Sequence, residues 1–137
     1  MDVTGRCLCG AVSFSASGVD DKLHVCHCRM CQHWFGGPAL GVSAGSVEFD
    51  DESGISTYAS SDWAERGFCG RCGSNLFYRL KDGSHIVLFT GTFDQPDGFS
   101  LGGEIFIDHK PSSYAFTGDH SRLTGDEFWA SIGQSGG

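Results

Sequence analysis

Seven cysteines in three tight groups are the feature of this 137-residue sequence that most constrains its fold. The groups contain Cys7 and Cys9, then Cys26, Cys28 and Cys31, then Cys69 and Cys72. Two sulfurs so close in sequence can face one metal ion, about 2.3 Å from each, only where the backbone turns tightly. Glycines beside these cysteines, Gly10, Gly70 and Gly73, provide that freedom. The spacing therefore predicts metal-binding knuckles.

The first and last groups together supply four thiols, which is the number that a closed, tetrahedral zinc site requires. The four residues are Cys7, Cys9, Cys69 and Cys72. Because the two pairs are roughly sixty residues apart, an ion between them would tie the beginning of the chain to its middle and close a long loop. The alternative is four buried thiols without a ligand role, which two glycine-flanked pairs make less plausible.

The middle group supplies only three thiols, so its fourth ligand is an open question. His33, His109 or a carboxylate could complete a second structural site, and His24 also lies nearby in the sequence. His27 stands between two cysteines in an extended segment, and we expect it to point away from them. The other possibility is a catalytic site with three protein ligands and one exchangeable position. Thiolate ligation favours thiol chemistry over the hydrolysis of hard oxygen substrates.

Composition and periodicity predict a single, mainly β domain over residues 1–137. The chain has 21 glycines and 11 phenylalanines, and its apolar runs are short. Val12, Phe14 and Ala16 alternate onto one face of a strand, and Thr124 with Glu127 predicts a capping box for a short helix. The expected strands cover residues 11–16, 23–25, 39–42, 46–49, 55–58, 74–80, 85–90 and 104–108.

The charge balance is acidic, with a net charge of −8 and a pI near 5.0. No basic patch is visible, so nucleic acid and anionic membranes are poor candidates for partners. No apolar run approaches the roughly 20 residues of a membrane span, and the N-terminal residues lack a signal pattern. We therefore expect a cytoplasmic protein, whose clustered cysteines are reduced and bind metal.

Three segments resemble the glutathione-dependent formaldehyde-activating enzyme family, also called the CENP-V/GFA domain. They are G-R-C-L-C-G-A-V-S-F, C-H-C-R-M-C-Q-H-W-F-G and R-G-F-C-G-R-C-G-S-N-L. The later G-E-I-F-I-D-H-K-P-S-S-Y resembles the closing strand and Lys-Pro turn of that family. The resemblance runs from about Gly5 to Tyr114, which makes residues 5–114 the expected core of the domain.

The resemblance implies an Mss4-like fold, in which small curved antiparallel sheets surround zinc-binding cysteine knuckles. It implies a structural zinc at the four cysteines named above, and a second, open zinc at Cys26, Cys28 and Cys31 that need not be fully occupied. It also implies a carbon–sulfur lyase similar to S-(hydroxymethyl)glutathione synthase, which joins a small thiol such as glutathione to formaldehyde or a related aldehyde. The catalytic residues and the oligomeric state stay unassigned.

Several side chains are candidates for the substrate pocket, although ordinary surface or core positions explain residues of these types as well. Candidates for binding the carboxylates of glutathione are Arg29, Arg66, Arg71 and Lys110. Trp34 and Phe35 could form a wall of the pocket, and His33 and His109 could carry protons. The alternative function is a zinc-stabilised binding module without turnover, because no Asp or Glu is placed as an obvious base.

Overall fold

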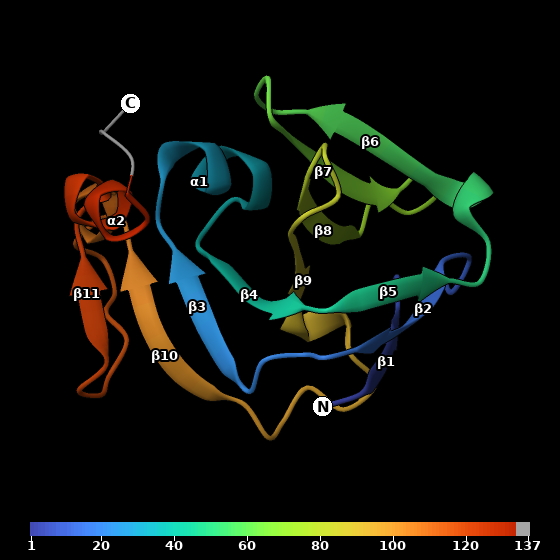
Figure 1. Ribbon diagram of the computed structural model, residues 1–137, viewed down its shortest axis with the longest axis horizontal. Helices are drawn as coiled ribbons and strands as arrows, with labels where there is room; N and C mark the ends of the chain where they lie inside the picture. Colours follow the sequence, from blue (N-terminus) through green and yellow to red (C-terminus); the bar gives the residue numbers. More distant parts are fainter. Residues whose placement is uncertain (134–137) are drawn as a thin grey trace. The chain divides into compact units, whose positions relative to one another are not determined.

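The structure of the protein, a computed structural model, describes residues 1–133. Within this range the chain forms eleven strands, two α-helices and three short 3-10 helices, which confirms the mainly β class (Figure 1). The chain divides into two compact units. Unit 1 consists of Met1–Asp21 and Gly41–Phe99, and unit 2 consists of Lys22–Leu40 and the chain from Ser100 onward. Unit 1 contains the first and last of the three cysteine groups, and unit 2 contains the middle group.

One sheet of unit 1 has three antiparallel strands in the order β1 (Val3–Arg6), β2 (Ser13–Ser17) and β5 (Ser46–Phe49). Phe14 and Ala16 of β2 are buried together with Val12, as their alternation predicts. Phe14 packs edge-on against Phe49 at 5.9 Å between ring centroids and against Phe93 at 6.2 Å. This aromatic cluster forms one part of the core of unit 1.

The other sheet of unit 1 is antiparallel and follows the order β4, β9, β8, β7, β6. The strands are β4 (Ala39–Ala44, of which residues 41–44 belong to this unit), β6 (Ile55–Ala59), β7 (Ala64–Cys69), β8 (Asn75–Leu80) and β9 (Ile86–Phe89). Leu76, Phe77 and Leu88 are fully buried. A Cβ at Gly67 would lie 2.2 Å from the Phe77 ring, so β7 has a glycine where that ring covers its backbone.

Unit 2 contains parallel strands, which differs from the antiparallel sheets that the resemblance implies. β10 (Ser100–Ile105) lies between β3 (Lys22–Cys26) and β11 (Ser121–Leu123) and is parallel to both (Figure 1). The physical reason is connectivity: no tight hairpin joins these strands, and the chain returns to the same end of the sheet before each strand begins. The unit also contains the helices α1 (Arg29–Phe35) and α2 (Gly125–Ser131).

The end of β10 is placed wrongly by the sequence pattern, which predicts a strand through residue 108. β10 ends at Ile105 because Phe106 adopts a left-handed conformation, with φ of 56°, and a 3-10 helix, η3 (Ile107–His109), follows. The Phe106 ring packs against Phe128 and Trp129 of α2. The capping box of α2 is confirmed, with Thr124 as its N-cap residue. The sequence pattern missed the strands β1, β7 and β11.

Two further 3-10 helices, η1 (Glu52–Gly54) and η2 (Thr90–Thr92), belong to unit 1. Among residues 1–133, no helix combines the length and the apolar character that crossing a membrane requires.

Candidate metal centres and an adjoining pocket

A four-thiol cluster in unit 1 brings together Cys7, Cys9, Cys69 and Cys72, with all four sulfurs within 4.8 Å of one another. The Cys7 and Cys9 sulfurs are 3.6 Å apart, and those of Cys9 and Cys69 are 3.8 Å apart. Four sulfurs at about 2.3 Å from a tetrahedral ion lie about 3.8 Å from each other. The spacing of the thiols therefore fits one zinc ion, although the identity of a metal here is a prediction.

The backbone around β7 explains how two of these sulfurs face the same point. The amide of Gly73, at φ of 81°, donates to the Cys69 carbonyl at 2.8 Å, which closes a tight turn. The amides of Arg71 and Cys72 each lie 3.4 Å from the Cys69 sulfur and donate to it. Amide donors stabilise a thiolate, so the turn prepares Cys69 to bind a cation.

The surroundings shift the pKa values of Cys7, Cys9 and Cys72 in different directions. The Ser74 hydroxyl, 3.1 Å from the Cys72 sulfur, lowers the pKa of Cys72 to about 5. The Ala11 amide lowers the pKa of Cys9, but desolvation and the neighbouring thiols outweigh it and raise that pKa to about 11. Burial raises the pKa of Cys7, yet hydrogen bonds, led by the Val12 amide at 3.3 Å, lower it overall. A bound divalent cation would displace the protons that these thiols share.

A three-thiol cluster in unit 2 contains Cys26, Cys28 and Cys31, with sulfurs within 4.8 Å of one another. β3 ends at Cys26, and Cys28 is the N-cap residue of α1, whose sulfur accepts a hydrogen bond from the Cys31 amide at 3.4 Å. A strand end and a helix cap therefore place the three sulfurs. Hydrogen bonds with Cys28 and Cys31, together with burial, raise the pKa of Cys26 well above its usual range.

No histidine or carboxylate in residues 1–133 joins the three-thiol cluster as a fourth ligand. His27 is fully buried and bonds to Glu104, so it points away from a shared ion as expected. His24 is exposed on β3. His109 packs on the ring of Phe106 and lies 3.8 Å from Asp108. In residues 1–133, the side chains of this cluster therefore supply three metal-ligating atoms, all of them sulfurs.

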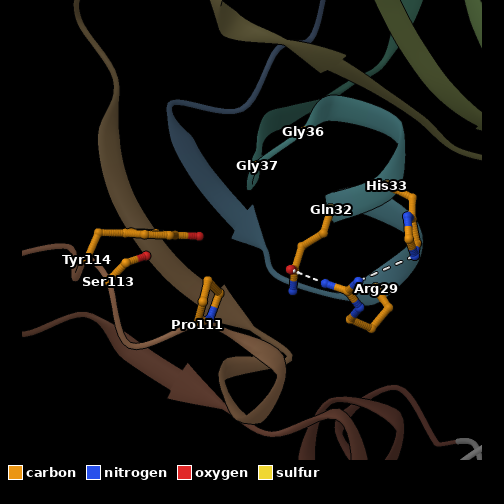
Figure 2. Close-up of a pocket in the computed structure, with 8 residues that line it drawn as sticks. All are labelled: Arg29, Gln32, His33, Gly36, Gly37, Pro111, Ser113 and Tyr114. Carbon is orange, nitrogen blue, oxygen red and sulfur yellow. Dashed lines mark hydrogen bonds between the residues drawn. The ribbon is translucent and has the colours of Figure 1, made fainter.

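A pocket of about 280 Å³ lies against α1 in unit 2 (Figure 2). Its lining residues are Arg29, Gln32, His33, Gly36, Gly37, Pro111, Ser113 and Tyr114. Gln32 lies one helical turn after Cys28, and its side-chain amide donates to the carbonyls of His27 at 2.7 Å and His109 at 2.9 Å. Through these two bonds, α1 is joined to the three-thiol segment at His27 and to the segment after β10 at His109. Both contacts lie beside the pocket.

The four predicted carboxylate-binding cations have different surroundings. The Arg29 guanidinium lines the pocket and bonds to Gln32 and His33, and among residues 1–133 no carboxylate pairs with it. The Lys110 ammonium instead donates to the carbonyls of Pro111 and Tyr114 within its own loop. Two of the cations belong to unit 1, where Arg66 is buried over the Tyr78 ring and Arg71 lies in the four-thiol turn. Arg29 is thus the predicted cation that the pocket contains.

Of the other predicted pocket residues, one lines the pocket and three do not. His33 lines the pocket and is 3.4 Å from Arg29, whereas Trp34, Phe35 and His109 are not among the lining residues. Sequence reasoning missed Tyr114 as a pocket residue, and it missed the buried Glu104. The signal for Tyr114 was the family-like segment G-E-I-F-I-D-H-K-P-S-S-Y, whose Lys-Pro turn is followed by this tyrosine. No local pattern marks Glu104, because its partners come from two distant segments, one with His27 and one with His120 and Arg122.

Comparisons with known proteins agree with the cysteine pattern. Residues 2–109 match the family model described as "Glutathione-dependent formaldehyde-activating enzyme". A protein from Schizosaccharomyces pombe described as an uncharacterized lyase is 32% identical over 130 residues, which cover 93% of this chain and 95% of that protein. A crystal structure of a Rhodobacter sphaeroides protein has a similar fold, with a TM-score of 0.55 and 18% identity, over 66% of this chain and 87% of that one. The chain belongs to the glutathione-dependent formaldehyde-activating enzyme family.

Proposed function

We propose that this protein is a zinc-dependent carbon–sulfur lyase similar to S-(hydroxymethyl)glutathione synthase. It joins a small thiol such as glutathione to formaldehyde or a related aldehyde. Cys7, Cys9, Cys69 and Cys72 hold a structural zinc in this proposal, and the three-thiol cluster holds a second zinc with an open position. The proposal includes an Mss4-like fold, a single domain over residues 1–137, and the cytoplasm as the reducing compartment in which free thiols persist.

The observation that carries the proposal is the three-thiol cluster with a polar pocket on the same helix. Three protein ligands leave the fourth position of a tetrahedral zinc for an exchangeable group. Cys28 caps α1, and Arg29 and Gln32 in the first turns of that helix line the pocket. A ligand seated in the pocket therefore contacts the helix that presents two of the three sulfurs, which suits a molecule with a thiol and further polar groups.

The family activity and the ligand chemistry agree on the type of reaction. A zinc ion bound here would lower the pKa of a thiol at its open position and keep it nucleophilic at neutral pH. The sulfur forms a bond to the aldehyde carbon, the carbonyl π bond breaks, and the thiol proton ends on the carbonyl oxygen. The chain contributes mainly by positioning, because Arg29 can bind a carboxylate of the thiol and hold its sulfur near the cluster.

Proton NMR exchange measurements on formaldehyde and glutathione, with and without the protein, test the reaction. We expect catalytic amounts of the protein to accelerate exchange between free glutathione and its hydroxymethyl adduct. Cys28→Ser should abolish the acceleration, because it removes a ligand of the open site. The matched variant Ser53→Ala, at an exposed position of the 3-10 helix η1 in unit 1, should retain it.

An exchange rate that equimolar protein leaves unchanged would contradict the lyase proposal. The alternative, a zinc-stabilised binding module, would then be supported by a partner that binds in a stoichiometric ratio while the aldehyde concentration stays constant. The two functions therefore differ in one measured quantity, the rate at which adduct forms per protein molecule.

A further inference from the structure

The pocket of unit 2 follows one face of α1 from the beginning of the helix to its end. The lining residues on this side have the spacing of a single helical face, and they are Arg29, Gln32, His33, Gly36 and Gly37. Arg29 is the first residue of the helix, and Gly36 is its C-cap residue. Because a helix rises 1.5 Å per residue, this side of the pocket is about 10 Å long.

This length indicates the size of a ligand that uses the whole pocket. An extended peptide advances about 3.5 Å per residue, so one amino acid covers about a third of the helical face and three residues cover all of it. At the beginning of the helix, no carboxylate among residues 1–133 pairs with Arg29, which is therefore available to an anionic group. A ligand whose carboxylate binds Arg29 reaches Gly37 only if it is about three residues long.

The two glycines at the far end of the pocket differ in what the fold requires of them. Gly36 has φ of 73°, and its amide donates to the Gln32 carbonyl at 2.8 Å, so the end of the helix explains this glycine. Gly37 lies outside the left-handed region, and a Cβ there would meet no atom within 4 Å. Within residues 1–133, neither backbone conformation nor packing therefore requires a glycine at position 37.

The open space at Gly37 belongs to the pocket, since this residue is part of its lining. The facing wall comes from the segment after β10, and Figure 2 shows the Tyr114 ring directed toward α1 from that side. A side chain at position 37 would take up room at this end of the pocket without a clash with the protein itself. A substitution at Gly37 therefore changes the space for a ligand and leaves the packing of the fold intact.

We propose that Gly37 is a specificity-determining residue, which sets the length of the thiol that the pocket accepts. Its missing side chain leaves room for the far end of a peptide thiol of about three residues, whose carboxylate binds Arg29. Thiols the size of one amino acid bind at the Arg29 end and do not reach Gly37. The inference rests on the proposed function, since it assumes that a thiol occupies the pocket.

Calorimetric binding of a long and a short thiol to the metal-loaded full chain tests this inference. Glutathione has three residues, and 3-mercaptopropionate has a carboxylate but only the length of one residue. Gly37→Leu should weaken glutathione about tenfold, because the added side chain and the ligand compete for the same space, and leave 3-mercaptopropionate unchanged. Arg29→Gln should weaken both thiols, since both have a carboxylate. Gly91→Leu in unit 1 is the matched control, because a Cβ there also meets no atom within 4 Å.

Gly37→Ala provides a second variant that does not depend on whether the leucine variant folds. Alanine restricts the unfolded chain more than glycine does, so the melting temperature should equal or exceed that of the wild type. Its effect on glutathione should be smaller than that of leucine and in the same direction. Circular dichroism and zinc content are the controls for folding.

Three outcomes would contradict the proposals, and they are distinguishable. If the wild type binds glutathione no more tightly than 3-mercaptopropionate, the pocket does not select by length, and the inference is wrong. If the folded Gly37 variants weaken both thiols equally, or neither, Gly37 does not set that length, and the lyase proposal is unaffected. If the wild type binds neither thiol, the proposed function fails, and the inference fails with it.

Discussion

The two cysteine clusters use the same side chain in different settings. In unit 1, two glycine-containing turns bring four sulfurs to the distances of a closed tetrahedron. In unit 2, a strand end and a helix cap bring three sulfurs together, and the cap begins the helix that lines a pocket. Unit 2 has, in addition, a buried hydrogen-bonded network around Glu104. From this comparison we propose that a metal at the four thiols would hold unit 1 together, whereas polar side chains stabilise unit 2 and would leave a metal at its three thiols available for chemistry.

Replacing one cysteine in each cluster gives the largest expected contrast. Cys69→Ser removes a ligand of the closed site, and because structural zinc contributes about 10 kcal/mol to folding, we expect the variant to unfold at ambient temperature. Cys26→Ser should lose one zinc ion of two and keep a melting temperature within a few degrees of the wild type. Zinc analysis and thermal melting measure both effects. Unfolding of Cys26→Ser as complete as that of Cys69→Ser would show that both sites are structural.

The next effect tests whether the Glu104 network stabilises unit 2. Glu104→Gln leaves two imidazoles and Arg122 beside an uncharged amide, and removing a carboxylate that is 1% exposed and paired through both oxygens costs about 3 kcal/mol. The matched control is Glu65→Gln, because the Glu65 carboxylate is 22% exposed and its pair with Arg79 is partly solvated and worth at most about 1 kcal/mol. Chemical denaturation measures the free energy of unfolding. Equal losses in the two variants would contradict the role given to the network.

A smaller effect tests how much of the stability of unit 1 comes from packing. Gly67→Ala places a methyl group 2.2 Å from the Phe77 ring, and overpacking of this kind costs about 1–3 kcal/mol. Gly91→Ala is the control, since its added carbon would meet no atom within 4 Å. Denaturation of the metal-loaded protein should show the difference between the two variants. If both lose the same amount, the close approach of Phe77 to the β7 backbone has no energetic importance.

The smallest effect concerns binding at the pocket of unit 2. Arg29→Gln should raise KM for glutathione about tenfold, which corresponds to loss of a charge-assisted hydrogen bond, and leave kcat nearly unchanged. Arg71→Gln, an arginine in the turn of the four-thiol cluster, should leave both constants unchanged. Steady-state kinetics of adduct formation separate these outcomes. A lower kcat with an unchanged KM in the Arg29 variant would assign that residue to the chemical step instead.

The cysteine groups and the mainly β class could be predicted from the sequence because both depend on local patterns. Spacing and adjacent glycines indicate a knuckle, and the alternation of Val12, Phe14 and Ala16 indicates a half-buried strand. The capping box at Thr124 is local in the same way, and it is confirmed. The assignment of the clustered cysteines as zinc ligands stays a prediction that the metal analysis above can test.

The features that sequence reasoning missed depend on contacts between distant segments. The strand β7 contains Arg66 and Gly67, which interrupt the expected alternation, and only the Phe77 ring explains the glycine. The parallel pairing of β10 is set by connections that no short pattern reveals. From the sequence alone, Glu104 is expected at the surface, as most carboxylates are. Its histidine and arginine partners make its burial possible.

The division of unit 2 into two separate stretches has a consequence for how the protein matures on the ribosome. All four sulfurs of the closed site have been synthesised once Cys72 has emerged, and unit 1 is complete at Phe99. β3 and α1, by contrast, must wait for β10 and the segments after it before they acquire their neighbours. Because chains fold from the N-terminus as they are made, a nascent chain offers the four thiols of unit 1 to a metal ion while unit 2 still lacks its second stretch.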